Sequence, residues 1–125
     1  MNNALKRQKG FTLIEVVAAL VILAVGLLGI AAMQITSTRS NHFSHDMTQA
    51  TILAQDKLEY LKNLSYNDSN LNHGIHDEGI VPGTLFTRFI EVAEDSGNSM
   101  KTITVTVRWT ERGPHAVSFT TIRSK

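Results

Sequence analysis

The feature that most constrains this chain is an uninterrupted apolar run near its start. Residues 16–33 read VVAALVILAVGLLGIAAM and contain no charged side chain. As a helix rising ~1.5 Å per residue, these residues reach about 27 Å, close to the thickness of the hydrocarbon core of a membrane. Residues 11–14 and Ile35 extend the apolar character on both sides. The run therefore predicts a membrane-spanning helix.

The charges around this run predict its orientation. Lys6, Arg7 and Lys9 precede it, and the next cation is Arg39. By the positive-inside rule, the N-terminus lies in the cytoplasm and the chain beyond Met33 lies on the far side of the membrane. A secretory signal peptide fits poorly, because its apolar core spans only ~7–15 residues and ends in a small-x-small cleavage site. A plain single-pass anchor remains the alternative.

Glu15 distinguishes this segment from a plain anchor. A carboxylate in a membrane span costs about 2.5–3.5 kcal/mol at full depth and less near the interface. No Lys, Arg or His lies between residues 11 and 35 to pair with it. A positive charge for Glu15 could come only from an amine created by chain cleavage. Gly10, which precedes Phe11, is a small residue suited to a protease pocket.

Residues 9–15, KGFTLIE, followed by the long apolar run, resemble the prepilin N-terminal motif of type IV pilins and type II secretion pseudopilins. The resemblance implies that a membrane-embedded aspartyl peptidase, the prepilin peptidase, cuts between Gly10 and Phe11 and methylates the new N-terminus at Phe11. It also implies that Glu15 pairs with the N-terminal amine of a neighbouring subunit during filament assembly. The basic leader containing Lys6, Arg7 and Lys9 belongs to the same motif.

The chain beyond the span predicts the second half of a long helix. Apolar residues recur there at spacings of three and four, which is typical of one helix face. These residues are Phe43, Met47, Ala50, Ala54, Leu58 and Leu61. We expect one helix from about Phe11 to Leu64. Four segments follow: a leader at 1–10, the transmembrane or assembly half of the helix at 11–35, its amphipathic half at 36–64, and a head at 65–125.

The head has the pattern of a small antiparallel sheet. Residues 65–83 are dense in Asn, Asp, Ser and Gly, which favours a loop. Alternating segments at 85–94, 102–109 and 116–123 predict three strands, with turns at 95–98 and 111–114. One apolar face of this sheet is expected to cover the helix stripe. The predicted fold is therefore α+β and pilin-like: a long N-terminal helix packed on a three-stranded antiparallel meander.

Two clusters of polar side chains are candidate metal sites. Ligand-type side chains gather at His73, His76, Asp77 and Glu78, and again at His42, His45 and Asp46. The spacing of the first group matches no zinc or calcium pattern. The second group has the i, i+3, i+4 spacing of metal ligands on a helix, but it lies just outside the predicted span, where polar side chains are simply hydrated. We therefore predict no metal and no cofactor. No catalytic set or phosphate-binding loop occurs either, so the chain is expected not to be an enzyme. Gly26 and Gly29 in the span predict close helix packing. The resemblance to pilins suggests, as an alternative, a stretch that loosens when subunits pack in a filament.

Net charge and cysteine content narrow the classes of protein to which this chain could belong. A net charge of +1 argues against a nucleic-acid binder. The absence of cysteine excludes disulfides and thiolate zinc sites, and it departs from major pilins, which often carry a disulfide.

Residues 21–29, VILAVGLLG, and the late ITVTVRW and TTIR stretches resemble the minor pilins called type IV pilus modification proteins. This resemblance implies a minor pilin of a tip or initiation complex, held in the bacterial inner membrane with its head in the periplasm. Its partners would be the prepilin peptidase, other minor and major pilins bound through the N-terminal helix, and membrane lipid. The alternative is a minor pseudopilin of type II secretion. A single-pass sensor or enzyme is less favoured, because residues 36–125 offer no catalytic set.

Overall fold

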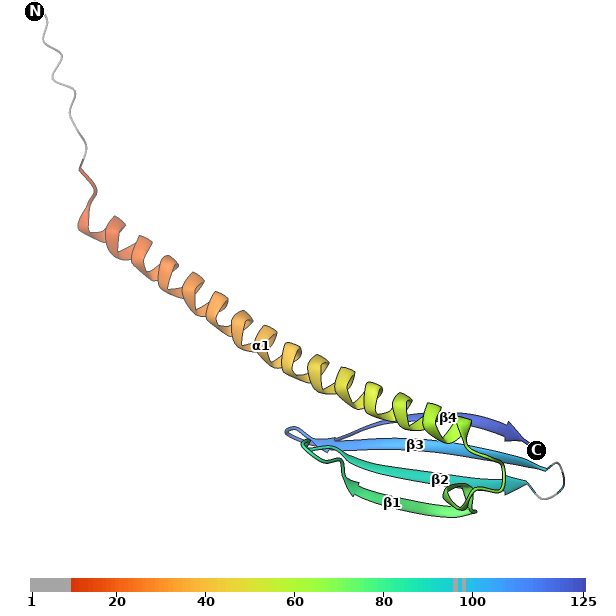
Figure 1. Cartoon of the computed structure of the whole chain (residues 1–125). Helices are drawn as coiled ribbons and strands as arrows, with labels where there is room; N and C mark the ends of the chain where they lie inside the picture. Colours follow the sequence, from red (N-terminus) through yellow and green to blue (C-terminus); the bar gives the residue numbers. More distant parts are fainter. Residues whose placement is uncertain (1–9, 96, 98) are drawn as a thin grey trace, which may run out of the picture. The chain divides into compact units, whose positions relative to one another are not determined.

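The computed structural model describes residues 10–95, 97 and 99–125. One long helix, α1, spans Leu13–Asn63 and is followed by a short 3₁₀ turn, η1, at Ser69–Leu71. Four strands complete the described chain: β1 at Gly74–Ile80, β2 at Thr87–Asp95, β3 at Met100–Thr110 and β4 at Pro114–Ser124 (Figure 1). The chain divides into two compact units, Met1–Ser40 and Asn41–Lys125. The predicted α+β class, with a long helix and an antiparallel sheet, is confirmed.

The sheet has four strands, so the prediction of three was wrong. All neighbouring strands are antiparallel, in the order β1-β2-β3-β4. The additional strand β1 lies within the predicted loop at 65–83. Its sequence, GIHDEGI, is polar and glycine-rich, because it is an edge strand held by backbone pairing with β2 and not by an alternating apolar face. The register shifts between Asp77 and Gly79, which marks a bulge at Glu78.

The other strands are displaced from their predicted limits by a few residues. β2 begins at Thr87, two residues later than predicted, and β3 extends beyond its prediction at both ends. β4 begins at Pro114, which was expected in the turn; proline is tolerated as the first residue of an edge strand. Of the predicted turn at 95–98, Ser96 and Asn98 lie outside the described residues.

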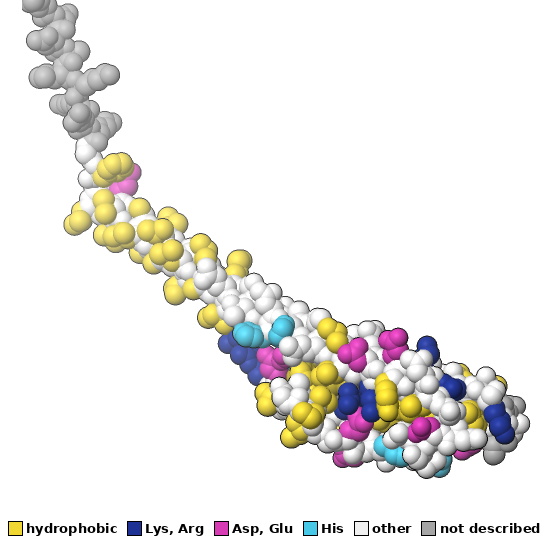
Figure 2. Space-filling model, in the orientation of Figure 1, with side chains coloured by type: hydrophobic (Ala, Val, Ile, Leu, Met, Phe, Trp, Pro, Cys, Tyr) yellow, Lys and Arg dark blue, Asp and Glu magenta, His cyan; other side chains and the backbone are white. Residues whose placement is uncertain are grey.

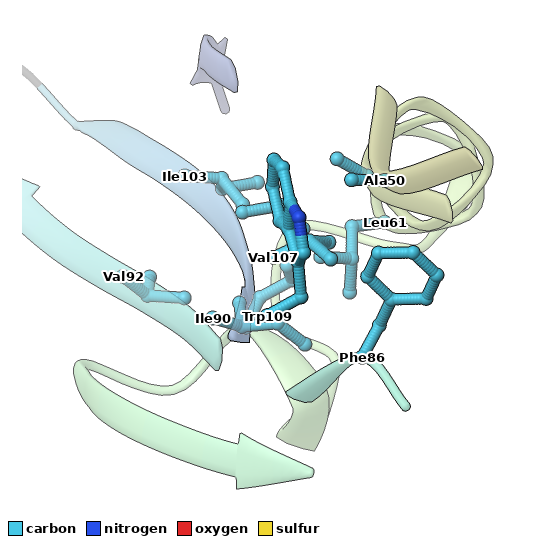
Figure 3. Packing of buried hydrophobic residues seen from close by; sticks show 11 residues of the cluster. Ala50, Leu61, Phe86, Ile90, Val92, Ile103, Val107 and Trp109 are labelled. Atoms are coloured by element: carbon cyan, nitrogen blue, oxygen red, sulfur yellow. The ribbon is translucent and has the colours of Figure 1, made fainter. Parts of the chain in front are cut away.

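The core lies between the last turns of α1 and one face of the sheet. Every second residue of β3 is buried, namely Lys101, Ile103, Val105, Val107 and Trp109. From α1, the fully buried residues are Ala50, Ala54 and Leu61, and Figure 3 shows Ala50 and Leu61 pointing toward this row. The predicted helix stripe is therefore confirmed at these positions. Met47 departs from it, since its side chain is 37% exposed.

Trp109 anchors one end of this core. Its ring centroid lies 5.8 Å from that of Phe86, 5.4 Å from that of His115 and 6.4 Å from that of Phe43. Tilted and edge-on aromatic pairs at these distances contribute beyond the area they bury. The cluster joins α1, the loop before β2 and both C-terminal strands.

Lys101 is the one buried charged side chain of the described residues, with 5% of its surface exposed. Its Nζ donates hydrogen bonds of 2.9 Å to the carbonyl oxygens of Tyr66 and Leu71, and it lies 4.5 Å from the Tyr66 ring centroid. On the neighbouring strand, Arg123 donates to the carbonyl of Lys62 in the last turn of α1. The hydrogen bonds of Lys101 and Arg123 therefore connect the end of α1 and the loop that follows it to the sheet. The sequence prediction missed Lys101, although it lies two residues before Ile103 and so shares its face.

Replacing Lys101 by methionine is expected to lower the free energy of unfolding by about 2–4 kcal/mol, because the buried carbonyl of Leu71 and the part-buried carbonyl of Tyr66 lose their donor. The measurement is urea unfolding of the full chain in detergent, followed by the fluorescence of Trp109, the single tryptophan. Lys62→Met, at an exposed lysine, is the matched control and should change little. An equal effect of both substitutions would contradict the assigned role.

Glu78 links the bulge of β1 to the helix and to β2. Its carboxylate lies 2.6 Å from Lys57 Nζ and 2.5 Å from Arg88 Nε. Partial burial by itself raises the pKa of Glu78, but hydrogen bonds and charge from Lys57 and Arg88 outweigh it and hold this pKa below its ordinary value of 4.5. The bulge places this side chain where both cations reach it.

A lowered folded-state pKa makes the contribution of Glu78 dependent on pH. Its stabilisation is fully present above the unfolded pKa and is lost as the pH falls through the lower folded pKa. Because the side chains are partly exposed, we expect about 1 kcal/mol. Urea unfolding between pH 7 and pH 3 should show this loss in the native chain, whereas Glu78→Gln should be less stable at pH 7 and lack this component. Parallel pH profiles for the two proteins would contradict it.

Candidate processing and assembly site

The segment before α1 is not helical. Gly10, Phe11 and Thr12 carry no regular secondary structure, and the Phe11 side chain is 83% exposed. The bond between Gly10 and Phe11 therefore lies in an accessible stretch, which is the kind of backbone that proteases cut. Among the described residues, a Cβ placed at Gly10 meets nothing within 4 Å. The leader cations Lys6, Arg7 and Lys9 lie outside the described residues.

Thr12 begins the helix as its N-terminal cap. The Glu15 backbone N–H donates to Thr12 Oγ1 at 3.3 Å, and the Thr12 carbonyl accepts from Glu15 N at 3.1 Å and Val16 N at 3.2 Å. A cap of this kind satisfies backbone donors that otherwise lack partners in the first turn. The sequence prediction missed Thr12, although Thr followed three residues later by Glu is a known signature of helix starts. The helix therefore begins two residues after Phe11.

Glu15 lies in the first turn of α1, on the face that also carries the two span glycines. Spacings of three, four and seven residues align Glu15 with Ala18, Ile22, Gly26 and Gly29. α1 passes through both glycines without a break, and a Cβ at either would meet nothing within 4 Å. This face therefore offers a carboxylate at its start and small residues along its length. Close packing of another helix on it stays a prediction.

The first half of α1 has the composition of a membrane span. In the described part of the chain, α1 is the one helix long and apolar enough to cross a membrane; its most apolar 18-residue window has a mean hydropathy of 2.8, with none of it buried. Figure 2 shows hydrophobic side chains on the surface along this part of the helix. Leu20, Ile22 and Leu28 are 58%, 73% and 72% exposed. Such an exposed apolar surface requires lipid or other helices as its surroundings.

The polar clusters of the sequence have other partners in the structure. Glu78 pairs with Lys57 and Arg88, His76 Nε2 lies 2.8 Å from the Asn72 carbonyl, and Asp77 accepts from Gly79 N. Within residues 10–95, 97 and 99–125, no group of three His, Cys, Asp or Glu is arranged to hold a metal ion.

Comparison with known proteins identifies the N-terminal segment. Residues 5–31 match the family model described as the prokaryotic N-terminal methylation motif. No curated protein and no solved structure matches the chain. The matched range contains Gly10, Phe11 and Glu15, as well as both span glycines. The chain therefore carries an N-terminal methylation motif of the prepilin type, joined to a pilin-like α+β fold.

Proposed function

We propose that this protein is a minor pilin, a structural and assembly subunit of a type IV pilus. The proposal rests on the positions of three features along the chain: the methylation motif, the Gly10–Phe11 bond and the start of α1. The methylation motif at residues 5–31 includes an exposed, non-helical Gly10–Phe11 bond, two residues before a helix of membrane-spanning character. In the proposed sequence of events, the prepilin peptidase cuts after Gly10 and methylates Phe11. The mature chain then begins two residues before α1.

The topology follows from the same segment. The basic leader stays in the cytoplasm, residues 11–35 cross the inner membrane among its lipids, and residues 65–125 form the head in the periplasm. The span then packs against the spans of other minor and major pilins. Glu15 pairs with the N-terminal amine of a neighbouring subunit, and this pairing fixes the register of assembly because either charge alone is costly in apolar surroundings.

Assignment to the minor pilins rests on the resemblance of residues 21–29 and of the late strand sequences to pilus modification proteins, and on the absence of cysteine. A minor pseudopilin of type II secretion has the same motif and the same physical requirements. The two differ in where the mature chain accumulates, which makes location the discriminating measurement.

The test is mass spectrometry of the N-terminal peptide from sheared surface filaments and from membranes. We expect a peptide that begins at N-methylated Phe11 in the filament fraction. The same processed end found only in the cell envelope would favour the pseudopilin. An uncut N-terminus in cells with an active prepilin peptidase would overturn the proposal.

A further inference from the structure

Leu85 is the most exposed large hydrophobic side chain among the described residues, with 91% of its surface accessible. It lies in the loop between β1 and β2, directly before Phe86, which is buried. This loop is closed by hydrogen bonds from Val81 N to the Phe86 carbonyl at 2.9 Å and from Thr84 Oγ1 to the Val81 carbonyl at 2.8 Å. These hydrogen bonds fix the conformation of the loop, and the Leu85 side chain projects from it into solvent.

Two cavities flank Leu85. The first, of about 500 Å³, lies between α1 and this loop, and its apolar lining includes Ile52, Phe86 and Trp109. The second, of about 590 Å³, lies at the ends of β3 and β4, and its lining also includes Leu85 and Trp109. Both volumes fall in the range of pockets that hold a ligand or a partner's side chain.

Trp109 forms part of the wall of the first cavity. The residue is 6% exposed, and its indole N–H has no hydrogen-bond partner among the residues that the structure describes. Figure 3 shows this nitrogen on the edge of the ring that faces Ala50 of α1. This edge of the ring lies against the chain's own helix, where Ala50 is fully buried, so Trp109 contributes an apolar wall to the first cavity.

Charges of opposite sign lie on either side of Leu85. Asp46 lines the first cavity, and Arg108 lines the second. A surface with an apolar projection, a cavity and two opposite charges is complementary to a second copy of itself. In a two-fold arrangement each contact occurs twice, with the roles of the copies exchanged.

We propose that this end of the head binds a second copy of the chain. Leu85 enters the partner's first cavity, and Asp46 lies against the partner's Arg108. The reverse pair of contacts completes the interface. A two-fold interface closes on itself, so it pairs subunits and does not by itself extend a filament. It is also independent of cleavage at Gly10, so its failure would leave the proposed function intact.

The first test measures the mass of the full chain in detergent as a function of concentration, by sedimentation. We expect a dimer whose dissociation constant rises at least about tenfold in Leu85→Glu, because a charge cannot enter an apolar cavity without cost. Ile75→Glu is the matched control, since Ile75 is 74% exposed on β1 and lines neither cavity. A monomer at all concentrations, or equal effects of both variants, would overturn the proposal. A dimer held only by the membrane spans would be insensitive to Leu85→Glu and would overturn it too.

The second test exchanges the charges. Asp46→Arg and Arg108→Asp should each weaken the dimer, and the double variant should restore it, because the pair forms again with reversed signs. Absence of restoration would overturn the assigned pairing. The chain has no cysteine, so a tagged Leu85→Cys chain mixed with an untagged Ile52→Cys chain should form a mixed disulfide dimer. The same mixture with Ile75→Cys should not, and equal yields would contradict the arrangement.

Discussion

Replacing Gly10 by valine is expected to leave the chain uncut, with its leader still attached. The structure leaves open space around Gly10, so the substitution disturbs no contact within the described chain. The effect must then arise in the peptidase, whose pocket has to accept the residue before the cut. Steric mismatch of a few heavy atoms in such a pocket changes rates by about 10- to 200-fold. Pulse labelling followed by mass spectrometry of the N-terminus measures the processed fraction.

The matched control is Gly113→Val. Gly113 lies in the turn between β3 and β4, and a Cβ there also meets nothing within 4 Å. This variant should be processed at the rate of the native chain. Normal processing of Gly10→Val would contradict cleavage at this bond. Equal losses in both variants would indicate a general effect of valine on the chain.

The helix and the central strand could be predicted from sequence because each has a strong periodic or apolar signal. The span lacks charge over eighteen residues, and β3 alternates strictly from Ile103 to Trp109. The sequence of β1 shows no periodic or apolar pattern. This strand pairs with β2 through backbone N–H and C=O groups, which do not depend on the side chains. Its composition of Gly, His, Asp and Glu resembles a loop, and only the position of β2 beside it makes it a strand.

The N-terminal methylation motif could be predicted because it is local in sequence. Gly10, Phe11 and Glu15 lie within six consecutive residues, and a short motif specifies all three. The surface around Leu85 could not be predicted in the same way. It joins Asp46 of α1, the loop before β2 and Arg108 of β3, which only the packed head brings together.

Glu15→Val is expected to be cut and methylated normally but to be nearly absent from filaments. The cap at the helix start should persist, because Thr12 Oγ1 bonds to the backbone N–H of residue 15 and not to its side chain. Processing should therefore be intact. Assembly should fail, because in the proposed pairing the substitution leaves the N-terminal amine of the neighbouring subunit unpaired, at a cost of about 3–5 kcal/mol. At ~1.4 kcal/mol for each factor of ten, incorporation should fall at least about a hundredfold.

Two further variants separate charge from shape. Glu15→Gln keeps the size of the side chain but not its charge, and we expect it to fail as Glu15→Val does. Glu15→Asp keeps the charge with a shorter reach, and it should recover part of the incorporation. The measurement compares the amount of processed chain in sheared filaments with that in membranes, with the peptide beginning at Phe11 quantified in both. Normal incorporation of Glu15→Gln would show that the carboxylate charge has no part in assembly, whereas failure of all three variants alike would indicate a requirement for the native shape of the side chain.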